Sequence, residues 1–274
     1  MGKAIDTIAV YSTQAGAAAF PTQLASLPAG DSLTIRSFPV TAKARIQSLI
    51  YSAGGSQKFR IQSPLMHDNV TGFTFAPAEV PALFQLPPDA PIGVSPVDTL
   101  SVYGAIAGAG TIVAGIVVDY DDLTGVSAHV YDYSDIRPHV KYYKSIEVDN
   151  LAIAVGAWTD TPITNTENQL HANKWYAVLG YQAAAACDII GVKGSATGNL
   201  RQCGPGGTQS LDLSSYFIYM SEQTGKPRIP VFNANDRAAF YVSQFNHAAV
   251  AAGNASVYLM VAELGDSFTP KPQS

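Results

Sequence analysis

The sequence predicts an all-β protein built from two tandem β-sandwich domains, with few short helices. Three observations lead to this prediction. Short apolar stretches alternate with polar residues at period two, turns rich in Gly, Pro, Asn and Ser separate them at regular intervals, and the series of stretches occurs twice. Such a pattern favours a sandwich or barrel over a parallel α/β sheet.

The repeat is clearest between residues 92–123 and the stretch that begins at residue 229. The same three landmarks follow one another in both copies, namely Ile92, Tyr103 and Gly110 in the first, and Ile229, Tyr241 and Gly253 in the second. Two further pairs of blocks lie upstream at nearly the same offset, 58–64 with 199–205 and 27–35 with 170–178. A unit of roughly 135 residues is an ordinary domain size, so the pattern indicates a duplication.

The elements expected in the first copy are mostly strands. They cover residues 7–11, 33–38, 44–51, 59–62 and 112–118, with a turn at Gly54-Gly55. One helix is predicted over residues 79–86, because Pro81 falls in its first turn and Pro87 ends it. The second copy has strands at 146–148, 151–155 and 175–181, and an apolar segment at 211–220 in the place of that helix.

The predicted domain organisation follows from the repeat. It comprises a first sandwich over residues 1–123, a connector rich in Tyr and His over 124–144, a second sandwich over 145–264 and a tail over 265–274. The tail is polar and contains prolines, so we expect it to reach a neighbouring molecule or to fray.

The composition points to surfaces that contact other chains. Apolar residues make up 47% and charged residues only 14%, with a formal net charge of −5, whereas about 25% charged residues is usual. A disordered chain would show the opposite bias. The 16 Lys and Arg residues form no cluster, which argues against sequence-specific nucleic-acid binding.

The N-terminus carries no targeting signal. It lacks the apolar core of a signal peptide, and Asp6 stands where a myristoylation signal has Ser or Thr. No apolar run approaches the ~18 residues of a membrane span. We therefore expect a soluble product made in the cytoplasm.

Cys187 and Cys203 are the two cysteines. A turn near residues 194–198 would bring them roughly opposite one another, so a disulfide is sterically feasible. Without an export signal, free thiols are the favoured state.

Several residues are of types that act as metal ligands or catalysts. Asp119, Asp121 and Asp122 offer clustered oxygens for a hard cation, but their spacing fits no calcium loop, which favours a solvated strand end. The five histidines are too scattered for a zinc motif: His67, His129, His139, His171 and His247.

The pairs His67-Asp68 and Asp135…His139 suggest a catalytic triad, yet no nucleophile elbow accompanies them, so ordinary loop polarity is favoured. The glycines at 54–55 and 204–207 lack the Lys-Ser/Thr of a phosphate loop and are interpreted as turns. Arg60 and Arg201 occupy matching places in the repeat, which predicts a shared structural ion pair or hydrogen bond. The sequence thus predicts no catalytic, cofactor-binding or metal-binding residue, and no cofactor.

Trp158 and Trp175, together with fourteen tyrosines, allow two interpretations. Aromatic rings stack on sugars, but they are also frequent in strands and at protein interfaces. The core or interface interpretation is favoured, and a sugar-binding face stays open as the alternative.

Two near-equal sandwiches with low charge and no catalytic constellation resemble the double jelly-roll major capsid proteins of tailless icosahedral, membrane-containing phages. The resemblance lies in architecture and covers residues 7–264. It implies two eight-stranded jelly rolls, homotrimers that form pseudo-hexagonal capsomers, and self-assembly into an icosahedral shell. The implied location is the virion, with assembly in the host cytoplasm.

The implied partners are further copies of the chain, other virion proteins and an internal membrane, and the terminal arms would reach either adjacent capsomers or that membrane. The alternative is a tandem β-sandwich that binds carbohydrate, such as a virion spike or a surface lectin. A β-sandwich hydrolase or isomerase is the third class considered.

Overall fold

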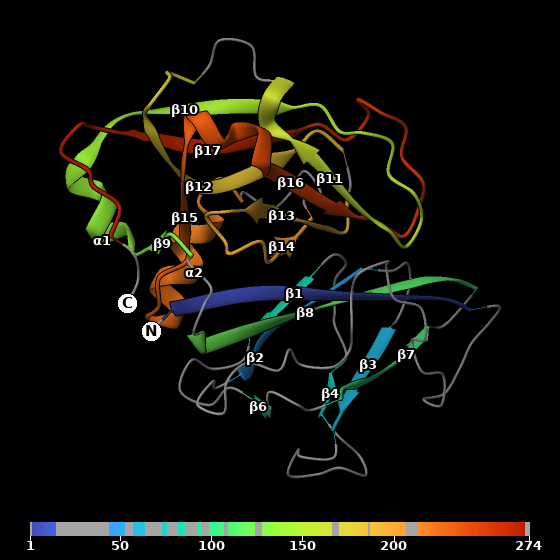
Figure 1. Ribbon diagram of the computed structural model, residues 1–274. Helices are drawn as coiled ribbons and strands as arrows, with labels where there is room; N and C mark the ends of the chain where they lie inside the picture. The colour runs from blue at the N-terminus through green and yellow to red at the C-terminus, as the bar shows by residue number, and fades with distance from the viewer. Residues whose placement is uncertain are drawn as a thin grey trace.

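The computed structural model describes residues 2–14, 44–52, 57–63, 73–75, 82–85, 92–94, 99–106, 109–123, 128–165, 170–185, 187–206 and 213–271. Strands dominate these residues and helices are few and short, which confirms the all-β prediction. The strands form sheets that lie one above another in two halves of the molecule (Figure 1).

The second half of the chain forms two sheets. The larger has the order β10 (Val140–Val148), β17 (Val257–Leu264), β12 (Trp175–Ala183), β15 (Ile229–Asn233) and β9 (Val130–Tyr131). The smaller has the order β11 (Trp158–Pro162), β16 (Phe240–Phe245), β13 (Ile189–Gly194) and β14 (Gln202–Pro205). The paired strands of both sheets are antiparallel.

The described residues of the first half also form two sheets. One has the order β1 (Gly2–Gln14), β8 (Gly110–Leu123), β2 (Ala44–Ser52) and β5 (Ala82–Gln85), with β6 (Ile92–Val94) also paired to β2. The other has the order β4 (Phe73–Phe75), β3 (Gln57–Gln62) and β7 (Ser101–Ile106).

The main core lies between the two sheets of the second half. Ile190 and Val192 of β13 belong to the same buried cluster as Tyr176 of β12. Phe232 and Phe240 stack within it, with their ring centroids 4.4 Å apart. Such an aromatic contact stabilises beyond the area that it buries.

The two halves pack sheet against sheet. Since successive side chains of a strand point to opposite faces, β13 places Ile190 in the main core and Ile189 on the other side. Ile189 joins a second buried cluster that spans both halves, consisting of Ile5, Ala9, Val113 and Val117 with Ile189, Cys203 and Phe245. The β1–β8 pair thus lies directly beneath the smaller sheet of the second half (Figure 1).

The helices are accessory elements: α1 (Tyr133–Ile136), α2 (Tyr216–Thr224) and the 3-10 helices η1 (Arg137–His139), η2 (Ile163–Asn165) and η3 (Ala234–Ala239). Helix α2 buries one face, including Phe217 and Met220. It ends at Gly225, whose φ of 61° is left-handed and favours glycine. This helix begins within the predicted apolar segment 211–220.

The helix predicted over residues 79–86 is wrong where the structure describes it. Residues 82–85 form strand β5, which pairs with β2 from Ser48↔Gln85 to Tyr51↔Ala82. Only five residues separate Pro81 from Pro87, too few for a stable helix. The open side of β2 supplies backbone partners that a short helix could not offer.

The tail prediction is also wrong for residues 265–271, which fold back onto their own chain. The Gly265 amide donates to the His139 carbonyl at 2.7 Å, and Phe268 is buried against Tyr131 with their ring centroids 5.4 Å apart. The Tyr131 hydroxyl bonds the backbone of Lys271. These contacts fix the tail to β9 and η1.

Most of the other strands predicted from the sequence coincide with strands of the structure. The strands at 7–11, 44–51, 59–62, 112–118, 146–148 and 175–181 lie within β1, β2, β3, β8, β10 and β12. Residues 151–155 contribute only isolated bridges at Ile153 and Val155. The 124–144 connector carries β9, α1, η1 and the start of β10. The strand 33–38 and the turn at Gly54-Gly55 lie outside the described residues. No helix in the described part of the chain is long and apolar enough to cross a membrane.

Gly156→Ala is expected to loosen the contact between the halves. A Cβ at Gly156 would lie 2.3 Å from the Tyr11 ring, and the φ of +64° is itself unfavourable for alanine. Gly253→Ala is the matched control, because its φ is +76° but nothing lies within 4 Å. We expect Gly156→Ala to cost about 1–3 kcal/mol more than Gly253→Ala in urea unfolding. Equal losses would show that Tyr11 does not press on residue 156.

Candidate functional site: a polar seam between the halves

A set of buried polar contacts joins the two halves and is here called the seam. It consists of Asp6, Thr7 and Asp119 of the first half and Arg201, Cys203, Lys226 and Arg228 of the second. The first-half residues lie on β1 and β8, and the second-half residues lie in or near β14 and after α2.

One part of the seam caps the edge of β14. The backbone amide of Arg201 donates to Asp6 Oδ1 at 3.2 Å, and that of Cys203 donates to Thr7 Oγ1 at 3.2 Å. Strand β14 is the last in its sheet, so these amides would otherwise be open to pairing with another chain. Strand β1 therefore closes this edge with side chains.

The other part of the seam is a buried ion pair. Asp119 Oδ2 accepts from Lys226 Nζ at 2.7 Å and from Arg228 Nη2 at 3.1 Å. The side chains of Asp119 and Arg228 are 3% and 2% exposed. The interpretation of Asp119 as a solvated strand end is therefore wrong, and the side chains of Asp121 and Asp122 lie outside the described residues.

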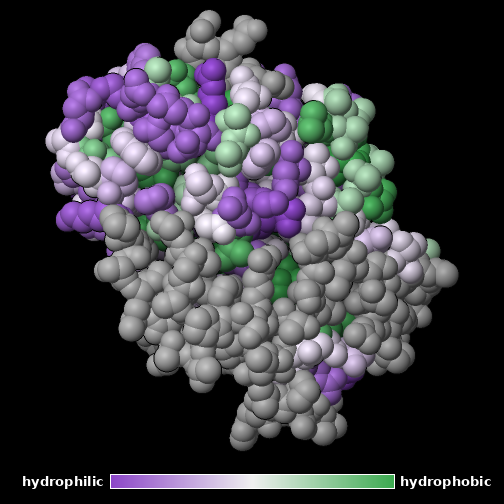
Figure 2. Space-filling model, viewed as in Figure 1, coloured by the Kyte–Doolittle hydropathy of each residue, from purple (hydrophilic) through white to green (hydrophobic). Residues whose placement is uncertain are grey.

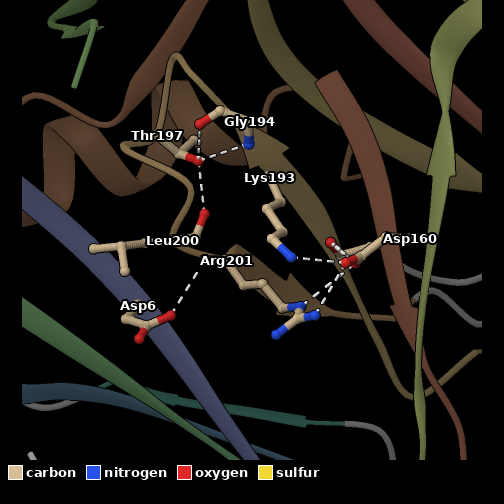
Figure 3. A network of polar contacts seen from close by, with 8 residues as sticks. Asp6, Asp160, Lys193, Gly194, Thr197, Leu200 and Arg201 are labelled. Atoms are coloured by element: carbon tan, nitrogen blue, oxygen red, sulfur yellow. Dashed lines mark hydrogen bonds and ion pairs between the residues drawn. The ribbon is translucent and has the colours of Figure 1, made fainter. Parts of the chain in front are cut away.

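A second carboxylate, Asp160 on β11, accepts hydrogen bonds from three side chains beside the seam, and Figure 3 shows those of Lys193 and Arg201. Lys193 Nζ lies 2.9 Å away, Arg201 Nη2 3.0 Å and Ser243 Oγ 2.7 Å. Burial raises the pKa of Asp160, but the hydrogen bonds from Ser243, Lys193 and Arg201 outweigh it and hold the pKa below its usual value. Arg201 thus links this network to β1 through its backbone.

A third carboxylate, Glu263 on β17, is held in the same manner. It is 2% exposed and accepts from the Tyr176 hydroxyl at 2.5 Å, with His171 Nδ1 at 2.8 Å. Burial raises its pKa, yet these hydrogen bonds and one from Tyr142 lower it overall. Lys144 lies 3.8 Å away.

These arrangements hold elements together. Asp119, Asp160 and Glu263 are each saturated by cations or hydroxyls of the chain, so they are poorly placed to act as bases or metal ligands. Across the described residues, no group of three or more His, Cys, Asp or Glu could hold a metal ion. The seam contacts themselves join β1 and β8 of the first half to β14 and to the segment after α2 in the second half.

Each described histidine contacts a different residue. His139 Nδ1 lies 2.9 Å from Ser267 Oγ, and His171 serves the Glu263 network. The His129 ring lies edge-on to Trp175, and His247 bonds Asp188. His67 and Asp68 lie outside the described residues. The structure places the His139 ring beside Ser267 and edge-on to the Phe268 ring.

The two arginines differ in their roles. Arg201 makes the predicted ion pair with Asp160, whereas the Arg60 guanidinium lies over the Tyr103 ring at 4.8 Å from its centroid. Of the predicted glycine turns, Gly204 is part of strand β14, and Gly206 follows directly. The strand there results from pairing with β13, which opposes Ile190 to Gly204.

Both tryptophans are half-buried and packed by side chains. The Arg201 guanidinium lies over the Trp158 ring at 4.7 Å, and Phe245 packs beside it at 5.2 Å. Trp175 contacts Phe268 edge-on at 6.4 Å. These contacts match the core interpretation and leave the sugar-binding alternative without a specific observation in its favour.

The cysteines are free and buried, as favoured from the sequence. Cys203 lies opposite Gly191 in the β13–β14 pair, while Cys187 precedes β13. Burial raises the pKa of the Cys187 thiol to about 12. Such thiols are inert at neutral pH.

His247 gives the second half a testable pH dependence. Its Nδ1 lies 2.8 Å from Oδ2 of the buried Asp188, and this hydrogen bond raises the pKa of His247 above 6.5 although partial burial lowers it. A raised folded pKa stabilises the fold below pH 6.5 and loses that effect as pH rises through the folded pKa. We expect His247→Gln to flatten the fall in Tm between pH 6 and 8, by the equivalent of under about 1 kcal/mol because the ring is 44% exposed.

The control for this prediction is His139→Gln, because the His139 ring bonds the Ser267 hydroxyl and not a carboxylate. That variant should keep the pH dependence of the original chain. Identical Tm profiles for His247→Gln and the unaltered protein would contradict the assignment.

Sequence reasoning missed most of the seam. Lys226 and Arg228 follow α2 without any motif, and their partner Asp119 is 107 residues from Lys226. Asp160 gave no signal in the sequence beyond its charge. The low number of charged residues could have served as a signal. Because only 14% of the residues are charged, a charged residue within an apolar stretch is a candidate for a buried ion pair.

No family model matches the sequence, and no curated protein matches it significantly. Among solved structures, the chain is similar to the crystal structure of the major capsid protein P2 from bacteriophage PM2. That likeness covers 97% of this chain and 99% of the other at 9% sequence identity, with a TM-score of 0.21. A TM-score this low establishes no shared fold.

Proposed function

We propose that this chain is a structural subunit of a virion shell, a major capsid protein in which two tandem jelly-roll sandwiches act as one building block. Three chains would form a pseudo-hexagonal capsomer, because six similar sandwiches approximate sixfold symmetry. The proposal rests above all on one observation: the strands of the two halves follow a similar order within their sheets.

The larger sheets of the two halves share an order of pairing. The first half reads β1-β8-β2 with β6 on β2, and the second reads β10-β17-β12-β15. The smaller sheets read β4-β3-β7 and β14-β13-β16, with β11 added in the second half. Such agreement supports a duplicated sandwich, with residues 1–123 as one copy, 145–264 as the other and 128–144 associated with the second.

The strand order also corrects the register of the repeat. Strand order equates β3 with β13, so Arg60, which opposes Tyr103, corresponds to Lys193, which opposes Tyr241. The earlier match of residues 58–64 with 199–205 is therefore not supported. The copies differ where β5 follows β4 and where α2 follows β14.

The seam supports the building-block role. A shell subunit must keep its two sandwiches in fixed relation, and the buried Asp119 pair together with the β1–β14 contacts supplies that rigidity. The low charged fraction of 14% suits a protein with large permanent interfaces, whose cores are depleted of charge. In this role the chain is not an enzyme, and its partners are other copies and other virion proteins.

The proposal is tested by the mass and shape of the purified chain. Light scattering after size exclusion should give three times the chain mass of 28.9 kDa, or a shell-sized particle. Electron microscopy should then show six-lobed capsomers. A monomer at all concentrations would overturn the proposal, and a monomer retained on a glycan column would favour the carbohydrate-binding alternative.

A further inference from the structure

Three side chains of types that bind metal ions converge at one end of the second half. Strands β10, β17 and β12 lie side by side in its larger sheet (Figure 1). Their register places Tyr142 of β10 and Tyr176 of β12 on either side of Glu263 of β17. His171, which precedes β12, reaches the same carboxylate. Tyr142, His171 and Glu263 are here called the Tyr-His-Glu site.

The donor atoms of the site lie within hydrogen-bond distance of one another. Tyr142 Oη is 2.7 Å from His171 Nδ1, which is 2.8 Å from Glu263 Oε2. A hydrogen bond also joins Tyr142 to Glu263. An octahedral ion with its ligands at about 2.0–2.1 Å separates neighbouring ligands by about 2.9 Å. The three atoms therefore have the spacing of one triangular face of an octahedron.

Glu263 differs from Asp119 and Asp160 in the kind of partner that saturates it. The two aspartates are held mainly by Lys and Arg side chains, which keep their protons and do not bind metals. The partners of Glu263 include a phenol and an imidazole, which become metal ligands when the shared protons leave. With one carboxylate and one imidazole, the site also lies outside the groups formed by His, Cys, Asp and Glu alone.

The site is open to water on one side. The Glu263 side chain is 3% exposed, whereas that of His171 is 59% exposed and Tyr142 is 38% exposed. Figure 2 shows hydrophilic residues gathered at the left of the upper half, where α1 and the C-terminal segment lie in Figure 1. An ion can therefore enter from solvent, and its remaining coordination positions are available to water or to small oxygen ligands.

Two further residues position the ligands. The Tyr176 hydroxyl donates to Glu263 Oε2 at 2.5 Å and accepts from the His171 backbone amide at 2.8 Å, so it fixes two of the three ligands. Lys144 Nζ lies 3.8 Å from Glu263 Oε2 and 5.2 Å from the centroid of the Tyr142 ring. Its positive charge favours the anionic forms of both groups. Support of this kind around the ligands is typical of metal sites.

The donor types determine which ion suits the site. Imidazole favours iron, copper, nickel and zinc over magnesium and calcium, and a tyrosine oxygen is a known ligand of haem iron. Desolvation and the hydrogen bond to Glu263 raise the pKa of Tyr142 to about 12. A divalent ion competes poorly for such a tightly held proton at neutral pH. A small trivalent ion, with its stronger attraction for anionic oxygen, is the better match.

We infer that Tyr142, His171 and Glu263 bind one ferric ion per chain. When the ion binds, the O–H bond of Tyr142 breaks, its proton passes to solvent, and the oxygen electron pair binds the iron without a change in oxidation state. The ion ties the edge strand β10 to β17 and to the segment before β12. The inference concerns the second half alone and does not depend on the proposed shell function.

The test adds ferric nitrilotriacetate to the full-length protein and removes the excess by gel filtration. The original chain should retain one iron and show a visible phenolate-to-iron charge-transfer absorption. Tyr142→Phe should abolish this absorption and weaken binding at least about tenfold. Tyr176→Phe should weaken binding about 10–100-fold and keep the absorption at saturating iron. Tyr143→Phe is the matched control on β10, since its hydroxyl bonds Tyr133, and it should bind like the original chain.

Folding and stability give an independent readout. Equal Tm values before iron is added show that the variants fold, and iron should then raise the Tm of the original chain but not that of Tyr142→Phe. Failure of the original chain to retain iron would overturn the inference, as would the same absorption in Tyr142→Phe. Zinc binding without any absorption on adding iron would overturn it too. None of these results bears on the trimer mass that tests the shell function, so the two proposals can fail separately.

Discussion

Asp119→Asn is expected to lower the free energy of unfolding by about 3–5 kcal/mol, the loss typical of a buried pair that loses one partner. The carboxylate pairs with both Lys226 and Arg228 at the junction of the halves, and the Arg228 side chain is only 2% exposed. Without it, two cations lie close together in a poorly hydrated site. Urea unfolding followed by tyrosine and tryptophan fluorescence measures the loss.

Two variants control for this effect. Lys226→Gln removes the more exposed cation and leaves Asp119 paired with Arg228, so its loss should be smaller. The triple variant Asp119→Leu/Lys226→Met/Arg228→Met should recover much of the stability, because an apolar cluster can replace a buried ion pair. A loss below about 1 kcal/mol for Asp119→Asn would mean that solvent reaches the seam.

Asp160→Ala should destabilise the protein by about 3 kcal/mol, at the lower end of the range for a broken buried pair because 23% of its side chain is exposed. Three donors lose their acceptor at once, including the Ser243 hydroxyl on a fully buried residue. Since the folded pKa of Asp160 is lowered, its contribution is present above the unfolded pKa and is lost as pH falls through the folded value.

The comparison that isolates this network is a pH series. Asp160→Asn retains the shape of the residue and should remove the pH dependence between about pH 5 and 2 that Asp160 contributes, while Asp135→Asn, on the exposed face of α1, should leave the curve in place. If Asp160→Asn and the original chain lose stability in parallel on acidification, the lowered pKa is not a source of stability.

The class of fold could be predicted from the sequence because period-two alternation depends only on residues that are neighbours in the chain. Stretches such as 112–118 and 175–181 read as strands without knowledge of their partners. The prediction of a helix over residues 79–86 was wrong because residues 82–85 form hydrogen bonds with the neighbouring strand β2. The prediction for the tail was wrong for the same reason. Phe268 packs against the rings of Tyr131 and His139, which come together only in the folded chain.

The seam could not be read from the sequence for a related physical reason. Its contacts join residues such as Asp6 and Arg201, which are 195 positions apart, and neither belongs to a motif. Arg201 was singled out correctly as an ion-pair former, but its acceptor Asp160 was not. Long-range pairs of this kind follow from the register of whole sheets, which single-sequence patterns do not fix.

The position of β1 also bears on how the protein is made. Strand β1 is synthesised well before its neighbour β8, which is complete only at Leu123, and its contacts with Arg201 and Cys203 need a still later part of the chain. Contacts so distant along the chain form late, so β1 stays uncovered during translation and is an expected chaperone target. The junction of the two halves can therefore close only after Arg228 has been made.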